Sequence, residues 1–179
     1  MISNETADEH RRAAPAVLGF AILTVSDTRS PGDDVSGRTI HDLISQSGHR
    51  IVDSKLVRDE VAEIRAAGRR LLELPEVDVV VTTGGTGFSP RDVTLEAAGP
   101  LLERPVEGFG ELFRMLSYQQ VGAAAMLSRA AAGIVTINGR AKALFLLPGS
   151  PKAVALALEK LILPEAGHLL GQARRVQSP

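Results

Sequence analysis

The segment from 82 to 94, TTGGTGFSPRDVT, combines flexible backbone with charge directly after an apolar run. Gly84, Gly85 and Gly87 allow backbone conformations that other residues avoid, so the chain can approach a ligand closely. Thr83 and Thr86 add hydroxyl donors, which suit the oxygens of a phosphate together with free N–H groups. The segment therefore predicts an anion site, with a tight turn that binds nothing as the alternative.

The same segment matches neither common nucleotide-binding motif. It has no lysine in the position required by G-x-x-x-x-G-K-[ST], and the run that begins at Gly85 lacks the third glycine of G-x-G-x-x-G. The glycines alone therefore leave the identity of the anion open.

Two aspartates follow the ends of predicted strands. Asp92 comes directly before a predicted helix, and Asp59 follows the strand that ends at Val57. Mg²⁺ is a hard cation that proteins hold with one or two carboxylates plus phosphate oxygens, so both acids are candidate metal ligands. The alternative is that each caps the helix after it, which stabilises a helix by about 1 kcal/mol.

A second glycine site, Leu147-Pro148-Gly149-Ser150-Pro151-Lys152, also ends a strand and begins a helix. Such a junction offers free N–H groups, a hydroxyl and an ammonium to an anion, although a plain turn with a solvated lysine has the same pattern. Further hydroxyls and acids occur near other strand ends. The residues expected at one common ligand site are Ser26, Asp27, Ser36, Gly37, Thr83, Gly84, Gly85, Thr86, Gly87, Pro148, Gly149, Ser150 and Lys152.

Other reactive side chains show no comparable pattern. The 4 histidines lack metal-ligand spacing. Ser128-Arg129 has no base nearby in the sequence that would make the serine a nucleophile. The absence of cysteine excludes thiolate zinc sites, disulfides and thiol catalysis, and it is typical of a protein from the reducing cytoplasm.

Strands and helices alternate along the chain and must position these residues. Apolar, β-branched runs predict strands at 17–25, 49–57, 77–83, 133–137 and 143–147. Helical spacing predicts helices at 36–48, 61–72, 94–102 and 109–119, a short piece near 123–126 and a last helix that ends before Pro164. The order predicts an α/β fold: a three-layer α/β/α sandwich with a mainly parallel central sheet. Asn138-Gly139 adds one antiparallel hairpin.

Length and charge limit the number of domains and the kinds of partner. The 179 residues are 44% hydrophobic and suit one domain, expected at 16–171, between a disordered N-terminal tail at 1–15 and a C-terminal tail at 172–179. With 20 basic and 21 acidic residues the net charge is −1, so we expect neither nucleic acid nor a membrane as partner. No run is apolar and long enough to span a bilayer.

The motifs, taken in order, resemble those of the MoaB/Mog family of molybdenum cofactor biosynthesis. The resemblance extends from Val17 to about Leu170. It rests on the segments 83–87 (TGGTG), 90–94 (PRDVT), 108–111 (GFGE), 128–129 (SR) and 147–152 (LPGSPK). Each motif alone is common, whereas the ordered set is specific.

The resemblance implies an enzyme that transfers AMP from Mg·ATP to the terminal phosphate of molybdopterin and releases pyrophosphate. Asp59 and Asp92 match the family's catalytic, Mg²⁺-linked acids, and the two glycine sites match its ligand-binding segments. The resemblance also implies a homo-oligomer, either a trimer or a hexamer. Because the chain has no second domain for metal insertion, we expect hand-over of the product to a separate molybdenum-insertion protein.

Two hypotheses of different classes follow. The first is a molybdopterin adenylyltransferase, and the second is a non-catalytic molybdopterin-binding or scaffold protein of the same fold. The two acids favour the enzyme, because binding of an anionic ligand alone would gain little from carboxylates.

Overall fold

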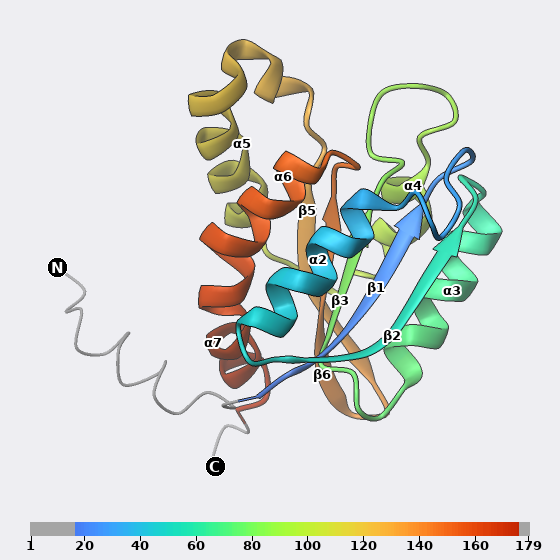
Figure 1. Ribbon diagram of the computed structural model, residues 1–179. Helices are drawn as coiled ribbons and strands as arrows, with labels where there is room; N and C mark the ends of the chain where they lie inside the picture. The colour runs from blue at the N-terminus through green and yellow to red at the C-terminus, as the bar shows by residue number, and fades with distance from the viewer. Residues whose placement is uncertain (1–16, 176–179) are drawn as a thin grey trace, which may run out of the picture.

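The computed structural model describes residues 17–175, and its centre is a six-stranded sheet of order β2-β1-β3-β6-β5-β4 (Figure 1). β1, β2, β3 and β6 run parallel, and β5 lies antiparallel between β6 and β4. This confirms the mainly parallel sheet. The strands are β1 (Gly19–Val25), β2 (Arg50–Val57), β3 (Val79–Thr83), β4 (Arg104–Pro105), β5 (Ala131–Ile137) and β6 (Arg140–Leu147).

Helices cover both faces of the sheet and complete the three predicted layers (Figure 1). The first face carries α2 (Val35–Gln46), α5 (Glu107–Val121), α6 (Pro151–Ala157) and α7 (Leu163–Ala173). The second face carries α3 (Val61–Glu73) and α4 (Thr94–Ala98), which is followed by η1 (Gly99–Leu101). Alternate residues of each central strand enter the two cores: Phe20 and Ile22 of β1 face the first, whereas Ala21 and Leu23 face the second.

The hairpin predicted at Asn138-Gly139 joins β5 to β6. Both turn residues adopt positive φ, 52° for Asn138 and 74° for Gly139. A two-residue turn needs this conformation to match the twist of the strands, and asparagine and glycine tolerate it best. The antiparallel strand therefore follows directly from the turn residues.

The last helix does not end before Pro164, contrary to the sequence prediction. α6 continues through a π-helical turn, η3 (Leu158–Ile162), into α7. Proline has no N–H and its ring collides with the carbonyl four residues earlier, which usually ends a helix. Here the wider turn comes immediately before the proline, and Pro164 falls in the first turn of α7, where it is tolerated.

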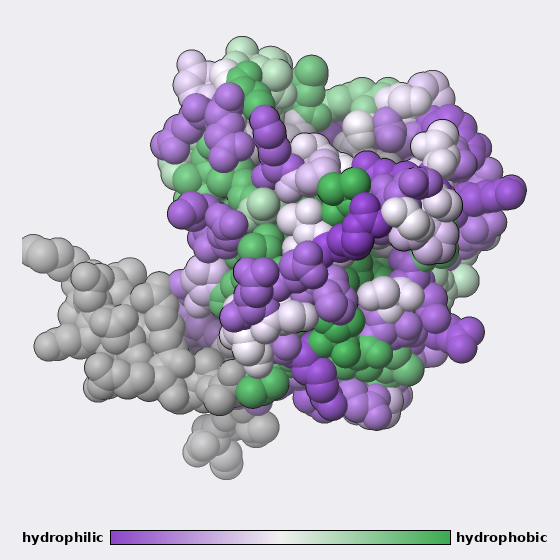
Figure 2. All heavy atoms as spheres, viewed as in Figure 1, coloured by the Kyte–Doolittle hydropathy of each residue, from purple (hydrophilic) through white to green (hydrophobic). Residues whose placement is uncertain are grey.

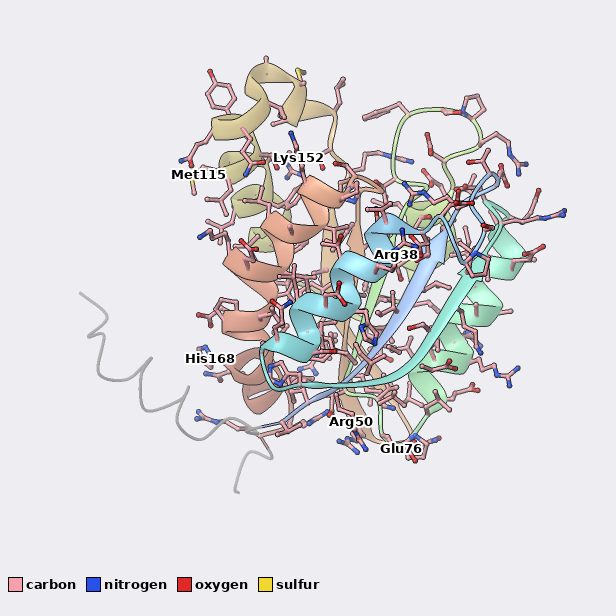
Figure 3. The ribbon with its side chains drawn as sticks, in the orientation of Figure 1. Arg38, Arg50, Glu76, Met115, Lys152 and His168 are labelled. Carbon is pink, nitrogen blue, oxygen red and sulfur yellow. The ribbon has the colours of Figure 1, made fainter. Side chains whose placement is uncertain are left out.

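An ionic cluster lies near the amino ends of β1 and β3. The Asp78 carboxylate accepts hydrogen bonds from the Gly19 N–H (2.9 Å), Arg140 (2.6 Å) and Arg174 (2.7 Å). Arg174 follows α7, so this cluster fixes the last helix to the sheet. Figure 3 shows Arg50 and Glu76 at the same end, opposite the carboxyl ends of the central parallel strands.

No helix within 17–175 has the length and apolar character needed to cross a membrane. The tail predicted at 1–15 lies outside the described residues.

Candidate functional site

A cleft of about 550 Å³ opens where the loops after four parallel strands meet. β1, β2, β3 and β6 each end at this edge, as expected for a ligand site in an open α/β sheet. We call it the main cleft. It is lined by Val25, Ser26, Thr28, Arg29, Asp59, Gly84, Gly85, Thr86, Gly87, Asp92, Ala124, Leu127, Ser128, Pro148, Gly149 and Ser150.

The glycine loop, residues 84–93, leaves β3 through two positive φ angles, 99° at Gly84 and 61° at Gly85. A side chain at Gly84 would collide with the backbone carbonyl of Val25, and one at Gly85 would collide with the carboxylate of Asp59. Gly84 and Gly85 are therefore required by the packing of the protein itself, whether or not a ligand binds. By the same geometry they bring the Asp59 carboxylate against the loop backbone.

Hydrogen bonds hold the start of the loop. The Gly84 N–H donates to the Leu147 carbonyl at 3.1 Å, and the buried Thr94 hydroxyl donates to the Gly84 carbonyl at 2.8 Å. Within the described chain, by contrast, no acceptor receives the N–H groups of Gly85, Thr86 or Gly87. Three successive unused N–H groups beside a cleft suit the oxygens of a phosphate.

Neither candidate metal ligand is a helix cap, so the structure removes the alternative for both. α4 begins after Val93 and α3 after Glu60, and no side chain caps either helix. Asp92 instead accepts the Ser89 N–H at 3.0 Å and closes the tip of the loop, while both acids line the main cleft.

The Asp59 carboxylate occupies an unfavourable place for a negative charge. Its Oδ1 atom is buried without a hydrogen-bond partner among residues 17–175. Burial raises the pKa of Asp59, and the negative charges of Asp27 and Asp92 raise it further. A cation at this point would supply the missing partner and relieve the repulsion.

The acids fit a magnesium ion that is shared with a ligand. Residues 17–175 contain no group of three or more acidic, histidine or cysteine side chains placed to hold a metal by themselves. Mg²⁺ is typically held by one or two carboxylates and completes its shell with phosphate oxygens and water. Asp59 and Asp92 would supply the protein's share.

The positive charge at the entrance is already paired. Arg91 makes hydrogen bonds of 2.9 and 3.0 Å to the Asp27 carboxylate and one of 3.0 Å to Glu60. The Arg91 guanidinium holds the pKa of Asp27 below its ordinary value. Asp27 also accepts the Asp59 N–H at 3.1 Å. These contacts connect the loops after β1 and β2 to the glycine loop.

The second glycine site packs directly against the first. A side chain at Gly149 would come within 3.2 Å of the Gly84 Cα atom. The Gly149 carbonyl accepts the Ser36 hydroxyl at 2.8 Å and Arg29 at 3.0 Å, and the Thr83 hydroxyl donates to Pro148 at 3.0 Å. These bonds fix the two walls of the main cleft relative to each other.

The structure therefore separates the expected site residues into two groups. Ten line the main cleft: Ser26, Asp59, Gly84, Gly85, Thr86, Gly87, Asp92, Pro148, Gly149 and Ser150. The others support it or lie beside it. Thr83 and Ser36 are buried and bonded to the second glycine site, Gly37 donates its N–H to Asp34, and Asp27 lies at the entrance.

Lys152 points elsewhere. It lines a neighbouring second cleft of about 740 Å³, between α5 and α6, which shares Ala124, Ser128, Pro148 and Ser150 with the main cleft. Figure 3 shows Lys152 at the start of α6, on the side toward α5. The ammonium expected at the ligand site therefore lies in the second cleft, beside the main cleft and the glycine loop.

Sequence reasoning missed the contribution of Ser128 and Arg129. The Ser128 hydroxyl is buried without a partner among the described residues and lines both clefts. Arg129 reaches under the glycine loop. In the sequence the pair is one of the motifs of the family resemblance, but neither residue was expected at the ligand site, because Ser128 was considered only as a nucleophile that would need a base.

Comparisons with known proteins identify the family of this chain. A family model described as "Probable molybdopterin binding domain" matches residues 21–168. Molybdenum cofactor biosynthesis protein B of Bacillus cereus is 45% identical over 168 residues, 93% of this chain and 97% of that protein. The protein of the same name from Staphylococcus aureus strain COL is 49% identical over 153 residues, 84% of this chain and 88% of that protein.

A solved structure extends the agreement to the fold. The crystal structure of the tungsten cofactor synthesizing protein MoaB from Pyrococcus furiosus superposes with a TM-score of 0.84 at 41% identity, covering 90% of this chain and 100% of that one. The sequence resemblance to the MoaB/Mog family is therefore confirmed. The chain belongs to the molybdopterin-binding domain family and, within it, to the branch of the molybdenum cofactor biosynthesis B proteins.

Proposed function

We propose that this protein acts in molybdenum cofactor biosynthesis by transferring AMP from Mg·ATP to molybdopterin. One observation carries the proposal: the Asp59 carboxylate, with a buried and unpartnered oxygen, lies against a glycine loop with unused N–H groups. This combination suits a magnesium-bound polyphosphate. Membership of the family supports molybdopterin as the acceptor.

The residues of the main cleft would act by placement and charge. The N–H groups of Gly85, Thr86 and Gly87 would bind phosphate oxygens of ATP, while Asp59 and Asp92 would hold the magnesium ion. When bound, that ion would neutralise charge on the phosphates. Such a site needs no protein nucleophile, because positioning and electrostatic stabilisation account for most of the catalysis in phosphoryl transfer.

The reaction itself is a displacement at phosphorus. A terminal phosphate oxygen of molybdopterin would form a bond to the α-phosphorus of ATP. The bond from that phosphorus to the oxygen that bridges to the β-phosphate would break, and pyrophosphate would leave. The charge lost by the attacking molybdopterin phosphate is gained by the departing pyrophosphate, so no histidine or serine has to supply a proton. Among the described residues that line the main cleft there is no histidine, and the proposed reaction does not use Ser26, Ser128 or Ser150 as a nucleophile.

The test is AMP transfer from labelled ATP to molybdopterin with Mg²⁺. We expect Asp59→Asn and Asp92→Asn each to reduce transfer by about 100-fold or more, since both remove charge that holds the ion. Asp42→Asn, an exposed change on α2, is the matched control. Undiminished transfer by Asp92→Asn would rule out its assigned role. Tight molybdopterin binding without transfer by the intact protein would favour the non-catalytic alternative.

We further propose that copies of the chain associate, as a trimer or a hexamer. α5 and η2 (Gly122–Leu127) expose apolar side chains, which Figure 2 shows as green atoms over this part of the surface. The exposed set is Leu112, Met115, Tyr118, Val121, Met126 and Leu127. Figure 3 shows Met115 on the side of α5 away from the sheet. Light scattering on the intact protein and on Met115→Glu tests this, with dissociation as the expected effect of the charge.

The product would then pass to a separate molybdenum-insertion protein in the cytoplasm. The main cleft holds carboxylates and glycine N–H groups and no thiolate, because the chain has no cysteine. Transfer of labelled adenylyl-molybdopterin to the insertion protein, measured with and without this chain, tests the hand-over.

A further inference from the structure

Arg129 lies under the glycine loop and contacts both of its ends. Its Nε donates to the Thr86 carbonyl at 2.9 Å, and its Nη2 donates to the Asp92 carbonyl, also at 2.9 Å. Thr86 belongs to the run of unused N–H groups, and Asp92 carries one of the two acids of the cleft. One guanidinium therefore spans the loop from its phosphate end to its carboxylate end.

The chemistry of arginine suits this position. A guanidinium is planar and permanently charged, and its donors are fixed in a fork, so it can bond two carbonyls at a set separation. The ammonium of a lysine is a single point charge, so it cannot bond both the Thr86 and the Asp92 carbonyl at that separation. The Arg129 side chain is only 22% exposed, so water does little to weaken these bonds.

Two further contacts hold the guanidinium itself. Its Nη1 pairs with Glu96 of α4 at 2.5 Å, and the ring of Phe88, at the tip of the loop, lies 5.3 Å from it in a cation–π contact. Arg129 comes from the segment just before β5, which is distant in sequence from the loop. The loop is therefore tied to a part of the fold outside its own strand and helix.

We propose that Arg129 is a positioning residue that fixes the separation between the phosphate-binding N–H groups and the Asp92 carboxylate. Without it, Thr94 still joins the base of the loop through its bonds to Gly84 and Gly85, but the Thr86 and Asp92 carbonyls lose their shared donor, and the separation between the N–H groups and the Asp92 carboxylate is no longer fixed. The inference rests on the proposed function, because it assumes that the loop binds phosphate.

The experiment compares Arg129→Lys with wild type and with Glu96→Gln. Lysine keeps the charge and loses the fork, whereas Glu96→Gln removes the ion pair and keeps both loop hydrogen bonds. Binding of inorganic pyrophosphate with Mg²⁺ is measured by calorimetry. Loss of one charge-assisted hydrogen bond predicts about tenfold weaker binding for Arg129→Lys. Glu96→Gln loosens the guanidinium but leaves both of its bonds to the loop, so it should weaken binding less than Arg129→Lys does.

A second readout needs neither ligand nor activity. Hydrogen exchange of a peptide covering 84–94 is followed in the metal-free protein, with peptides from β1 and β3 as internal references. We expect faster exchange in the loop peptide of Arg129→Lys and unchanged exchange in the reference peptides. A variant that is merely less stable would exchange faster in all of them, and this result would overturn the proposal.

The outcomes separate the two proposals. Wild-type affinity for pyrophosphate in Arg129→Lys, or unchanged exchange in its loop peptide, overturns the role of Arg129. Failure of the wild-type protein to bind pyrophosphate would instead contradict the proposed function, and loop exchange alone would then decide whether Arg129 fixes the loop.

Discussion

Replacing Asp59 with asparagine should stabilise the metal-free protein while it destroys the proposed reaction. Asp59 Oδ1 is buried without a partner, and the charges of Asp27 and Asp92 oppose its ionisation. Asparagine keeps a polar atom at this place and removes the charge, so the gain comes from the lost desolvation and repulsion of the carboxylate; partial exposure of the side chain keeps that gain on the order of 1 kcal/mol. We therefore expect Asp59→Asn to raise the free energy of unfolding by about 1 kcal/mol, or the melting temperature by about 3 °C.

The sign of the pH dependence follows from the raised pKa of Asp59. In the folded protein the carboxyl keeps its proton to a higher pH than in the unfolded chain, where its pKa is near 3.8. The contribution of Asp59 to the stability of the wild type therefore falls as pH rises from 3.8 through the folded-state pKa. Asparagine has no such dependence, so its advantage should be small near pH 4 and reach its full size above the folded-state pKa.

The assay is thermal unfolding of both proteins, without divalent cations, from pH 4 to pH 8. Asp42→Asn, on the exposed side of α2, controls for the general effect of removing a carboxylate. Adding Mg²⁺ with pyrophosphate should stabilise wild type and have little effect on Asp59→Asn. A lower melting temperature for Asp59→Asn at pH 8, or an advantage that does not change with pH, would refute the reasoning.

Three further changes test the supports of the site. Asp78→Asn leaves the guanidinium groups of Arg140 and Arg174 without their counter-charge and should lower the melting temperature by about 10 °C. Burial raises the pKa of Asp78, but its hydrogen bonds outweigh burial and lower that pKa overall, so the stability that Asp78 contributes to the wild type is lost as the pH falls below 3.8. Thr94→Val leaves the Gly84 carbonyl without its hydroxyl donor and should cost about 1–2 kcal/mol in urea unfolding. Gly85→Ala places a methyl group against Asp59 at a φ of 61°, which should cost about 1 kcal/mol or more and weaken pyrophosphate binding in calorimetry.

The parts of the fold that depend on local sequence were predictable. Alternating strands and helices gave the layers, and Asn138-Gly139 gave the hairpin, because both depend on neighbouring residues. The continuation of the last helix through Pro164 could not be predicted, because it depends on a π-helical turn that has no sequence signature. Nor was β4, a two-residue strand that exists only because β5 lies beside it.

The site shows the same division. That Asp59 and Asp92 would lie at one sheet edge follows from strand order, and the structure places both in the main cleft. Pairing of Arg91 with Asp27 could not be predicted, because it joins residues from separate loops. The position of Arg129 is a similar case, since its two acceptors are backbone carbonyls, which every residue has.

The order of strands in the sheet also sets when the cleft can form during synthesis. β1, β2, β3 and the glycine loop all lie within residues 19–93. Gly84, however, bonds to Leu147 and the Thr83 hydroxyl to Pro148, and both partners leave the ribosome more than 60 residues later. Until β6 inserts beside β3, one wall of the cleft is missing and an apolar strand edge is open to other nascent chains. Binding competence and protection from aggregation therefore arrive in the same late step of folding.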